Sequence, residues 1–318
     1  MNVLLTGAFG NIGQSALDAF LSRGHTVRCF DLKTKTNKRV SRSYRRHAEI
    51  YWGDMRCRED LDEALRDIDV VVHLAFVIPT LSATGISSET DPEWAREINV
   101  EGMRNLLEAM KMHPKPPRII FSSSLHIYGK TQHLPPPRSI LDTPDPIEHY
   151  AKHKVECEQM LHFSGLSWAI FRLGASLPVR LLMDPAMFDV PLDNRIEFVH
   201  RRDVGCAIAN GLETEEIWGK IWHIGGGPDC QLYQRDLVEG VLESVGVGML
   251  PDVAFTDEPY PTDWLDTEES QRILNYQKRT LADYIEDVKK RVGFRRFFIR
   301  LFRPIIRVWI LSKSDMQV

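Results

Sequence analysis

Tyr150 and Lys154 have the residue types and the spacing of a proton-transfer pair. They stand four residues apart within 148–163, where the pattern predicts a helix, so both side chains share one helix face. A tyrosine has a pKa of about 10 and exchanges protons near neutral pH only when that pKa is lowered. A nearby ammonium lowers it by favouring the phenolate. Such pairs also occur by chance on protein surfaces, so a third group is needed to support a catalytic interpretation.

Three consecutive serines, Ser122, Ser123 and Ser124, supply a candidate for that group. They follow the apolar run 118–121, which predicts a strand. A hydroxyl at the end of a strand can hydrogen-bond a reacting carbonyl or alcohol and hold it against the phenol. The combination indicates proton transfer at a secondary alcohol or a ketone.

A glycine-rich turn provides the element that would position a cofactor for this chemistry. Gly7, Gly10 and Gly13 lie between the apolar run 2–5, a predicted strand, and 14–23, which has helical apolar spacing. In such a turn one glycine permits the tight bend, one lets the backbone approach a pyrophosphate, and one lets the helix pack on the strand. The N-terminus of the helix then offers N–H groups to the phosphates.

Asp31 ends a second apolar run, 26–30, and stands 18 residues after Gly13. A carboxylate at this position accepts hydrogen bonds from an adenosine ribose. The basic segment 33–46 is either a solvated loop or a pocket for a 2′-phosphate. The charge of Asp31 would repel that phosphate, so we predict NAD binding and favour NAD over NADP.

Predicted strands and helices alternate through the first half of the chain. Further strands are expected at 48–52, 69–75, 118–121 and 167–173, and helices at 92–112 and 148–163. This order predicts the α/β class, with a Rossmann-type doubly wound parallel sheet and a small C-terminal substrate cap. Beyond Gly174 the alternation loosens, and Phe198 to His200 are expected to form a short strand. We divide the chain into an NAD-binding domain with the catalytic residues (1–173), mixed segments that complete the sheet and form the cap (174–292), and a basic amphipathic tail (293–318).

Composition limits the classes of function. The 318 residues are 43% hydrophobic and 26% charged, with a net charge of −4, which gives no general attraction to nucleic acid. The five cysteines are scattered without a CxxC pair, so we expect neither a disulfide set nor a metal site. With no signal peptide and no apolar stretch long enough to span a bilayer, a cytoplasmic protein is expected.

Taken together, these features resemble the extended short-chain dehydrogenase/reductase family, which includes NAD-dependent sugar-nucleotide epimerases and dehydratases. The resemblance covers nearly the whole chain up to about Val292. It is carried by Thr6 to Gly13, Asp31, Asp54, His73 to Ala75, Asn99 to Gly102, Phe121 to Gly129, Tyr150 with Lys154, Phe198 to Val204, and Ile224 to Gly227.

The resemblance implies a catalytic triad of Ser124, Tyr150 and Lys154, with Lys154 also holding the nicotinamide ribose. It implies that Asn99 supports the cofactor helix and the active-site water or lysine, and that the chain dimerises through the helices at 92–112 and 148–163. The predicted cofactor-binding set is Gly7, Phe9, Gly10, Asn11, Ile12, Gly13, Asp31, Asp54, Met55, Leu74, Ala75, Phe76, Asn99, Ser122, Tyr150, Lys154, Leu173 and Ala175.

Two departures from the family pattern bear on the substrate. Dehydratases and decarboxylases of the family carry acidic residues just after the catalytic hydroxyl, whereas this chain has Leu125 and His126. Elimination of water needs a second proton carrier. We therefore set dehydratase chemistry aside and interpret His126 as a core or loop residue. After the strand at 167–173, the family's Arg-Pro and asparagine are replaced by Arg172 to Ser176, and 174–198 is short, which reduces the expected sugar-nucleotide contacts.

The tail at 294–311 is basic and rich in aromatic residues. Arg296, Arg300, Arg303 and Arg307 recur every three or four residues, with apolar side chains between them. This pattern is typical of a segment that lies in a membrane interface, and the arginines and Pro304 argue against a spanning helix. The alternative is that the tail packs on its own domain or on a partner subunit.

The leading hypothesis is an NAD-dependent oxidoreductase or epimerase that transfers hydride at a secondary alcohol or ketone of a sugar or sugar nucleotide. The first alternative is a membrane-associated dehydrogenase of a lipophilic, steroid-like alcohol. The second is an NAD-sensing binding protein, against which the intact Ser124, Tyr150 and Lys154 argue.

Overall fold

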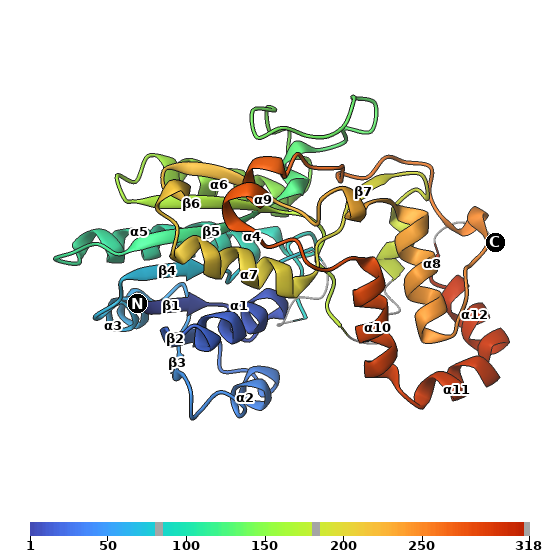
Figure 1. Ribbon diagram of the computed structural model, residues 1–318, viewed down its shortest axis with the longest axis horizontal. Helices are drawn as coiled ribbons and strands as arrows, with labels where there is room; N and C mark the ends of the chain where they lie inside the picture. Colours follow the sequence, from blue (N-terminus) through green and yellow to red (C-terminus); the bar gives the residue numbers. More distant parts are fainter. Residues whose placement is uncertain (80–84, 180–184, 315–318) are drawn as a thin grey trace.

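A seven-stranded parallel sheet forms the centre of the computed structural model, which describes residues 1–79, 85–179 and 185–314 (Figure 1). The strand order is β3-β2-β1-β4-β5-β6-β8, and every neighbouring pair is parallel. The order reverses between β1 and β4, the place where such folds bind ligands. The strands are β1 (Asn2–Thr6), β2 (Thr26–Asp31), β3 (Glu49–Trp52), β4 (Val70–His73), β5 (Arg118–Ser124), β6 (Trp168–Leu173) and β8 (Lys220–Ile224).

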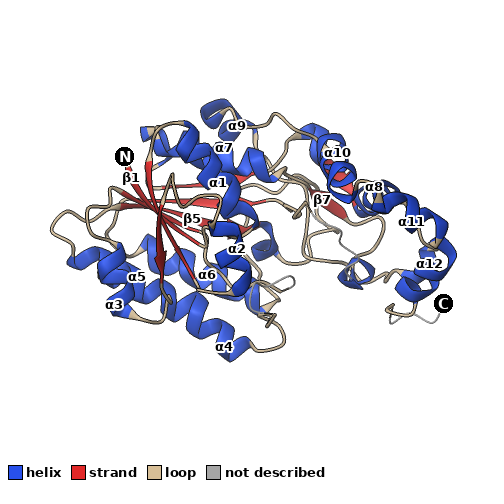
Figure 2. Cartoon of the chain, turned by 90° about the horizontal axis from the view of Figure 1, so that it is seen from below, coloured by secondary structure: helices blue, strands red, loops and turns tan. Residues whose placement is uncertain are grey.

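Helices cover both faces of this sheet (Figure 2). On one face α1 (Asn11–Ser22) packs against α7 (Arg201–Leu212), and α9 (Glu268–Leu274) lies beside α7. On the other face are α3 (Arg58–Ala64), α5 (Gly102–Met112) and α6 (His149–His162). Each layer has its own buried apolar core, one around Leu17 and Phe20 and one around Leu106 and Phe121. The doubly wound α/β prediction is confirmed.

Three local predictions differ from the structure. The helix expected at 92–112 is α4 (Pro92–Arg96), a π-helical turn (Glu97–Glu101) and α5, so the backbone is widened around Asn99. Part of the basic segment is a short helix, α2 (Lys35–Ser41). The short strand expected at Phe198 is shifted toward the N-terminus: β7 is Arg195–Glu197, and Phe198 forms only an isolated bridge to Ala175.

The cap lies beyond the carboxyl ends of the strands, at the right of Figure 1. Its small antiparallel sheet pairs β7 with β9 (Gln231–Tyr233). Helices α8 (Gln234–Val245) and α10 (Leu281–Val292) pack together over a third apolar core that contains Leu237, Tyr284 and Val288. Short helical turns complete the chain at Leu125–Tyr128, Pro185–Asp189, Glu215–Ile217, Pro228–Cys230 and Asp252–Ala254.

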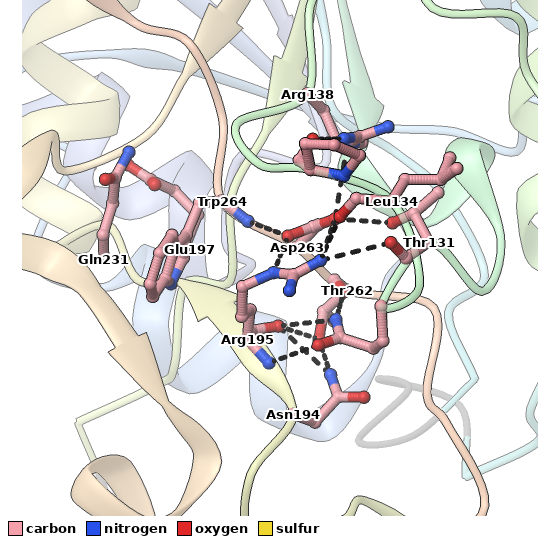
Figure 3. Close-up of polar contacts among 12 residues, drawn as sticks. Thr131, Leu134, Arg138, Asn194, Arg195, Glu197, Gln231, Thr262, Asp263 and Trp264 are labelled. Atoms are coloured by element: carbon pink, nitrogen blue, oxygen red, sulfur yellow. Dashed lines mark hydrogen bonds and ion pairs between the residues drawn. The ribbon is translucent and has the colours of Figure 1, made fainter.

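A buried polar network joins the cap to the segment that follows β5. Figure 3 shows the Asp263 carboxylate between Arg195, Arg138 and Thr131. Arg195 Nε lies 2.6 Å from Asp263 Oδ1, and the Thr131 hydroxyl donates to Oδ2 at 2.8 Å. Arg138 Nε is 3.3 Å from the same oxygen. Because Asp263 is almost fully buried and paired, this network fixes the cap against the segment that follows β5.

The tail forms two short helices, α11 (Arg295–Leu301) and α12 (Arg303–Leu311), at the end of the cap farthest from the sheet (Figure 1). Ile299 and Ile310 are buried in the cap core. Arg296 and Arg307 donate to the carbonyls of Glu243 and of Val247 to Met249, so they anchor the tail to the end of α8. No helix in the described ranges is long and apolar enough to cross a membrane.

Candidate active site

The glycine-rich turn connects β1 to α1, as its spacing predicts. Gly7 has a positive φ of 66°, and a Cβ there would lie 2.8 Å from the backbone nitrogen of Ala75 on the neighbouring strand end. A Cβ on Gly13 would collide with the backbone of Gly7 and Ala8. Gly10 precedes the first residue of α1, and no side chain caps that helix. The turn therefore leaves a close backbone approach at a helix N-terminus, a geometry that suits a pyrophosphate.

Asp31 lies at the end of β2, beside this turn. Its Oδ2 accepts the Phe9 N–H at 2.9 Å, and its Oδ1 accepts the Leu32 N–H at 2.8 Å and the Asn37 amide at 2.9 Å. Burial raises the pKa of Asp31 to about 6, although the hydrogen bonds from Phe9 and Leu32 oppose that rise. Asn37 is a partner of Asp31 that the sequence analysis missed. Thr34, whose hydroxyl caps α2, is the signal that could have located it.

The end of β4 is fastened to the same turn. The Thr6 hydroxyl lies 2.8 Å from His73 Nδ1 and accepts the N–H groups of Leu74 and Ala75 at 3.2 Å. One step further, Asn99 exchanges two hydrogen bonds with the backbone of Val77, at 2.7 and 3.0 Å. Asn99 therefore clamps the segment that carries the predicted cofactor residues Leu74, Ala75 and Phe76.

Asp54 and Met55 lie farther along the edge of the sheet. The Asp54 carboxylate accepts hydrogen bonds from the backbone N–H and from the guanidinium of Arg56. These hydrogen bonds hold the pKa of its carboxyl below the ordinary value. Met55 is buried against Gly102, where a Cβ would lie 2.8 Å from the Met55 Cβ. Asp54 is therefore paired with a neighbour, and Met55 packs against the helix that follows Asn99.

Ser124 and Tyr150 come together at the end of β5. Burial raises the pKa of the Tyr150 phenol to about 12, and a hydrogen-bonding contact with the Ser124 side chain opposes that rise. Leu173, the last residue of β6, is the register partner of Ser124, and Ala175 follows it in a bridge to Phe198. Ser124, Leu173 and Ala175, predicted from different parts of the chain, thus lie at the carboxyl ends of neighbouring strands, and Tyr150 reaches Ser124 from α6.

Lys154 is almost completely buried beneath Tyr150, with 2% of its surface exposed. Its ammonium donates to the Ser122 carbonyl at 2.5 Å and lies 3.5 Å from the centre of the Phe76 ring. No carboxylate forms an ion pair with it among the described residues. Burial lowers the pKa of Lys154 to about 7. Phe76 also packs edge-to-face on Tyr150, at 5.7 Å between ring centres, so it links the cofactor-side residues to the catalytic set.

Four polar side chains that the sequence analysis did not assign to the site surround the start of α6. Glu89 accepts the backbone N–H groups of His149 and Tyr150. His126 Nδ1 lies 2.7 Å from Glu148 Oε2, and Tyr260 from the cap hydrogen-bonds Glu148 as well. These contacts join residues that are distant in the sequence, so local spacing does not predict them.

Arg172 belongs to the framework and not to the lining of the site. Its guanidinium makes two hydrogen bonds to Glu158, at 3.1 and 2.7 Å, and a third to the Tyr128 hydroxyl at 2.7 Å. All three groups are buried. The segment in which the resemblance placed sugar-nucleotide contacts therefore begins with an arginine that is already paired.

Comparison with known proteins identifies the family. The model of the NAD dependent epimerase/dehydratase family matches residues 3–175, just over half of the chain. The chain therefore belongs to this family. The matched stretch contains the glycine-rich turn, Asp31, the serines, Tyr150 and Lys154.

Individual relatives share about a third or less of their residues with this chain, over about half of its length. The chain is 33% identical over 160 residues to the N-acetyl-alpha-D-glucosaminyl-diphospho-ditrans,octacis-undecaprenol 4-epimerase of Escherichia coli O157:H7, covering 50% of this chain and 42% of that protein. It is 28% identical over 176 residues to a putative UDP-glucose 4-epimerase of Methanocaldococcus jannaschii, covering 54% of each. The chain thus spans about half the length of the curated relatives it matches.

A solved structure matches the fold over a greater length. The UDP-glucuronic acid 4-epimerase of Bacillus cereus, in complex with UDP-glucuronic acid and NAD, superposes with a TM-score of 0.77 at 20% identity. The match covers 92% of this chain and 99% of that chain. This likeness extends the shared architecture from the sheet into the cap.

Proposed function

We propose that this member of the NAD dependent epimerase/dehydratase family transfers hydride, with NAD, at a secondary alcohol or ketone of a sugar or sugar nucleotide. The observation that carries the proposal is the position of the buried Lys154, whose ammonium donates to the Ser122 carbonyl at 2.5 Å and lies 5.6 Å from the centre of the Tyr150 ring, which Ser124 also contacts. Ser124 ends β5, which β4 separates from β1 and its glycine-rich turn, and Asp31 ends β2 on the far side of β1.

The residues around the turn fit a dinucleotide. Gly7 and Gly13 keep the backbone clear, α1 presents its N-terminus, and Asp31 supplies a carboxylate at the end of β2. With a pKa of about 6, Asp31 is mainly ionised at pH 7, so it accepts ribose hydroxyls and repels a 2′-phosphate. This supports NAD over NADP. When bound, the oxidised nicotinamide would supply the hydride acceptor and a positive charge that favours the Tyr150 phenolate.

Each catalytic side chain has a distinct task in this proposal. Tyr150 accepts the proton of the substrate hydroxyl, or donates it in the reverse direction. Ser124 orients the substrate oxygen against the phenol. Lys154 stabilises the phenolate from beneath, its ammonium 5.6 Å from the centre of the Tyr150 ring, and holds the ribose next to it. The other cofactor residues of the sequence analysis remain part of the proposal.

The sugar substrate rests on the relatives, two of which are named as 4-epimerases of sugar diphosphates or nucleotides. Native mass spectrometry of the purified chain, followed by thermal-shift titration with NAD, NADP, UDP-glucose, UDP-N-acetylglucosamine and a sterol panel, tests it. Co-purified NAD and stabilisation by a UDP-sugar are expected. A chain that is purified empty and responds only to sterols would transfer the proposal to a dehydrogenase of a lipophilic alcohol, and one that binds NAD without any turnover would favour an NAD sensor.

We also propose that α11 and α12 bring this protein to the surface of an anionic membrane. Eight large apolar side chains of the tail are 50–78% exposed: Phe294, Phe297, Phe298, Leu301, Phe302, Ile305, Val308 and Trp309. Residues 293–314 carry six basic and no acidic residues in a chain of net charge −4. Exposed aromatic side chains with arginines among them fit an interface of anionic headgroups. A sugar carried on a membrane lipid would suit this surface.

Sedimentation with vesicles tests the membrane contact. The chain is expected to sediment with phosphatidylglycerol-containing vesicles and much less with pure phosphatidylcholine, and Phe297→Ser with Leu301→Ser should abolish the difference. Leu141→Ser, which removes an equally exposed large apolar side chain elsewhere, is the matched control. Equal recovery of the wild-type chain in the supernatant with both vesicles would contradict the contact.

Two further parts of the proposal concern organisation. The three divisions at 1–173, 174–292 and 293–318 are proposed as units of function, with residues 315–318 outside the described structure. A homodimer through 92–112 and 148–163 is supported by exposed Met112 and Phe163 at the ends of those helices. Sedimentation equilibrium of the wild-type chain and of Met112→Lys tests the dimer.

A further inference from the structure

His126 is held against the two residues that handle the substrate oxygen. Its backbone N–H donates to the Ser124 hydroxyl oxygen at 3.3 Å, while the Ser124 hydroxyl group also bonds the Tyr150 phenol. The imidazole and the Tyr150 ring meet edge-to-face, with their centres 6.0 Å apart. His126 and Tyr150 are therefore neighbours, and both contact Ser124.

A carboxylate orients this imidazole. Glu148 Oε2 lies 2.7 Å from His126 Nδ1, and the two side chains are 16% and 19% exposed. When Nδ1–H donates to the carboxylate, Nε2 is left as the proton acceptor of the ring. The same carboxylate stabilises the imidazolium once a proton has been taken up, which is the arrangement of an oriented general base.

The Glu148 carboxylate does not cap the helix that it precedes. Glu148 immediately precedes α6, where a side chain commonly caps the first N–H groups, but its side chain makes no such bond. Glu89, from a distant loop, accepts the N–H groups of His149 and Tyr150 instead. Glu148, which stands at the capping position of the helix, thus pairs with the imidazole, and its second partner is the Tyr260 hydroxyl.

On the inner side of Tyr150, the polar groups of the described chain are already engaged. Lys154 donates to Ser122, the Asn99 side chain is bound to Val77, and the Asn99 carbonyl accepts from the Cys157 thiol. Lys154 and Asn99 are both buried, whereas His126 is partly exposed. The imidazole is thus a polar group next to Tyr150 that also reaches solvent.

We propose that His126, oriented by Glu148, is a second proton-transfer residue of this site and carries protons between the Ser124–Tyr150 pair and water. In the oxidative direction the substrate hydroxyl proton moves to the Tyr150 oxygen. The proton that Tyr150 yields moves to His126 Nε2 and then to water, so one proton leaves and His126 is restored. The reductive direction runs the same steps backward. The inference rests on the proposed proton-transfer role of Tyr150.

Acidic and phenolic groups from several elements face this imidazole. Glu148, Tyr150 and Glu89 lie at the start of α6, and Tyr260 contacts the ring from the cap at 5.6 Å between centres. Asp189 acts on Tyr260 from the turn Pro185–Asp189.

Sulfonation of Tyr150 in the intact chain tests the proposal without any need for turnover. p-Nitrobenzenesulfonyl fluoride forms an S–O bond to a phenol oxygen and releases fluoride, and the phenol proton must pass to a base. Peptide mass spectrometry gives the labelling rate of Tyr150 between pH 6 and 9. The wild-type rate is expected to fall at least about tenfold in His126→Ala at pH 7 and to recover in the presence of imidazole.

Matched variants separate proton transfer from folding. Glu148→Gln should slow labelling less than His126→Ala, and His126→Asn should be slow while it retains a polar partner for Glu148. His162→Ala, at the other end of α6, should label at the wild-type rate. Unchanged labelling in His126→Ala, failure of imidazole to restore the rate, or a wild-type Tyr150 that stays unlabelled to pH 9 would each overturn the proposal. If the wild-type chain shows no redox turnover but imidazole still restores the labelling of Tyr150 in His126→Ala, the proposed function alone would be overturned.

Discussion

Two buried cations lie along helix α6 and differ in how their charge is compensated. Arg172 reaches Glu158 on that helix with two hydrogen bonds and the Tyr128 hydroxyl with a third. Lys154, one turn before Glu158 on the same helix, has one backbone carbonyl and the faces of aromatic rings.

The two pKa values record the difference. Burial lowers the pKa of both cations, but Glu158 outweighs it for Arg172, whose pKa is raised, whereas that of Lys154 falls to about 7. A fully paired charge belongs to the framework. A charge buried without a counter-ion is retained where it acts on other groups, here the Tyr150 phenol and a bound cofactor.

The largest expected effect is on activity, in Lys154→Met. Because the ammonium stabilises the phenolate, turnover should fall by about 10³-fold or more. Stability should change by less than about 1 kcal/mol or increase, since a buried charge without a carboxylate is replaced by a side chain of similar volume. Turnover numbers and urea unfolding of the same preparation measure both. A variant that keeps its activity would make Lys154 a second framework cation.

Arg172→Met should show the opposite pattern. Removal of one partner leaves Glu158 buried and uncompensated, so the free energy of unfolding should fall by about 3–5 kcal/mol. The double variant Arg172→Met, Glu158→Leu should recover most of that loss, because it removes both charges. Urea denaturation of the two variants makes the comparison. Equal stability of Arg172→Met and the wild type would mean that the pair contributes nothing to the framework.

A smaller effect concerns the pH dependence of stability. The Lys154 pKa is about 7 in the folded chain and near 10.5 when unfolded, so between these values the unfolded state binds more protons. The Lys154 contribution therefore makes the folded state more stable as pH rises from 7 to 10, by up to about 1.4 kcal/mol per pH unit. Lys154→Met should remove this slope, and Lys152→Met, on the exposed face of α6, should keep it. Identical slopes in all three chains would contradict the lowered pKa.

The sequence predicts the parts of the site that depend on local spacing, and it does not predict the contacts between distant residues. The glycine-rich turn, Asp31 and the Tyr150–Lys154 pair were accessible because each depends on short-range spacing within one strand–turn–helix unit or one helix face. Their neighbours were not. Glu89 caps α6 from 60 residues away, and Glu148 pairs with His126 across 22 positions.

The fold shows the same limit. The seven parallel strands follow from alternation of apolar runs, but β7 was misplaced because its pairing with β9 depends on a segment more than 30 residues later. The π-helical turn at Asn99 was missed because helical apolar spacing continues through it. It brings the Asn99 side chain to Val77 and its carbonyl to Cys157, contacts that depend on tertiary packing.

The most direct test of the central claim is cofactor reduction at 340 nm in the purified chain. Wild-type protein with NAD would be mixed with UDP-glucose or UDP-N-acetylglucosamine and compared with Tyr150→Phe and with the control Tyr233→Phe on the cap surface. We predict NADH formation or epimerisation of the sugar by the wild type and Tyr233→Phe, and a rate at least about 10²-fold lower in Tyr150→Phe, which still binds NAD. Reduction by Tyr150→Phe at the wild-type rate would contradict the account.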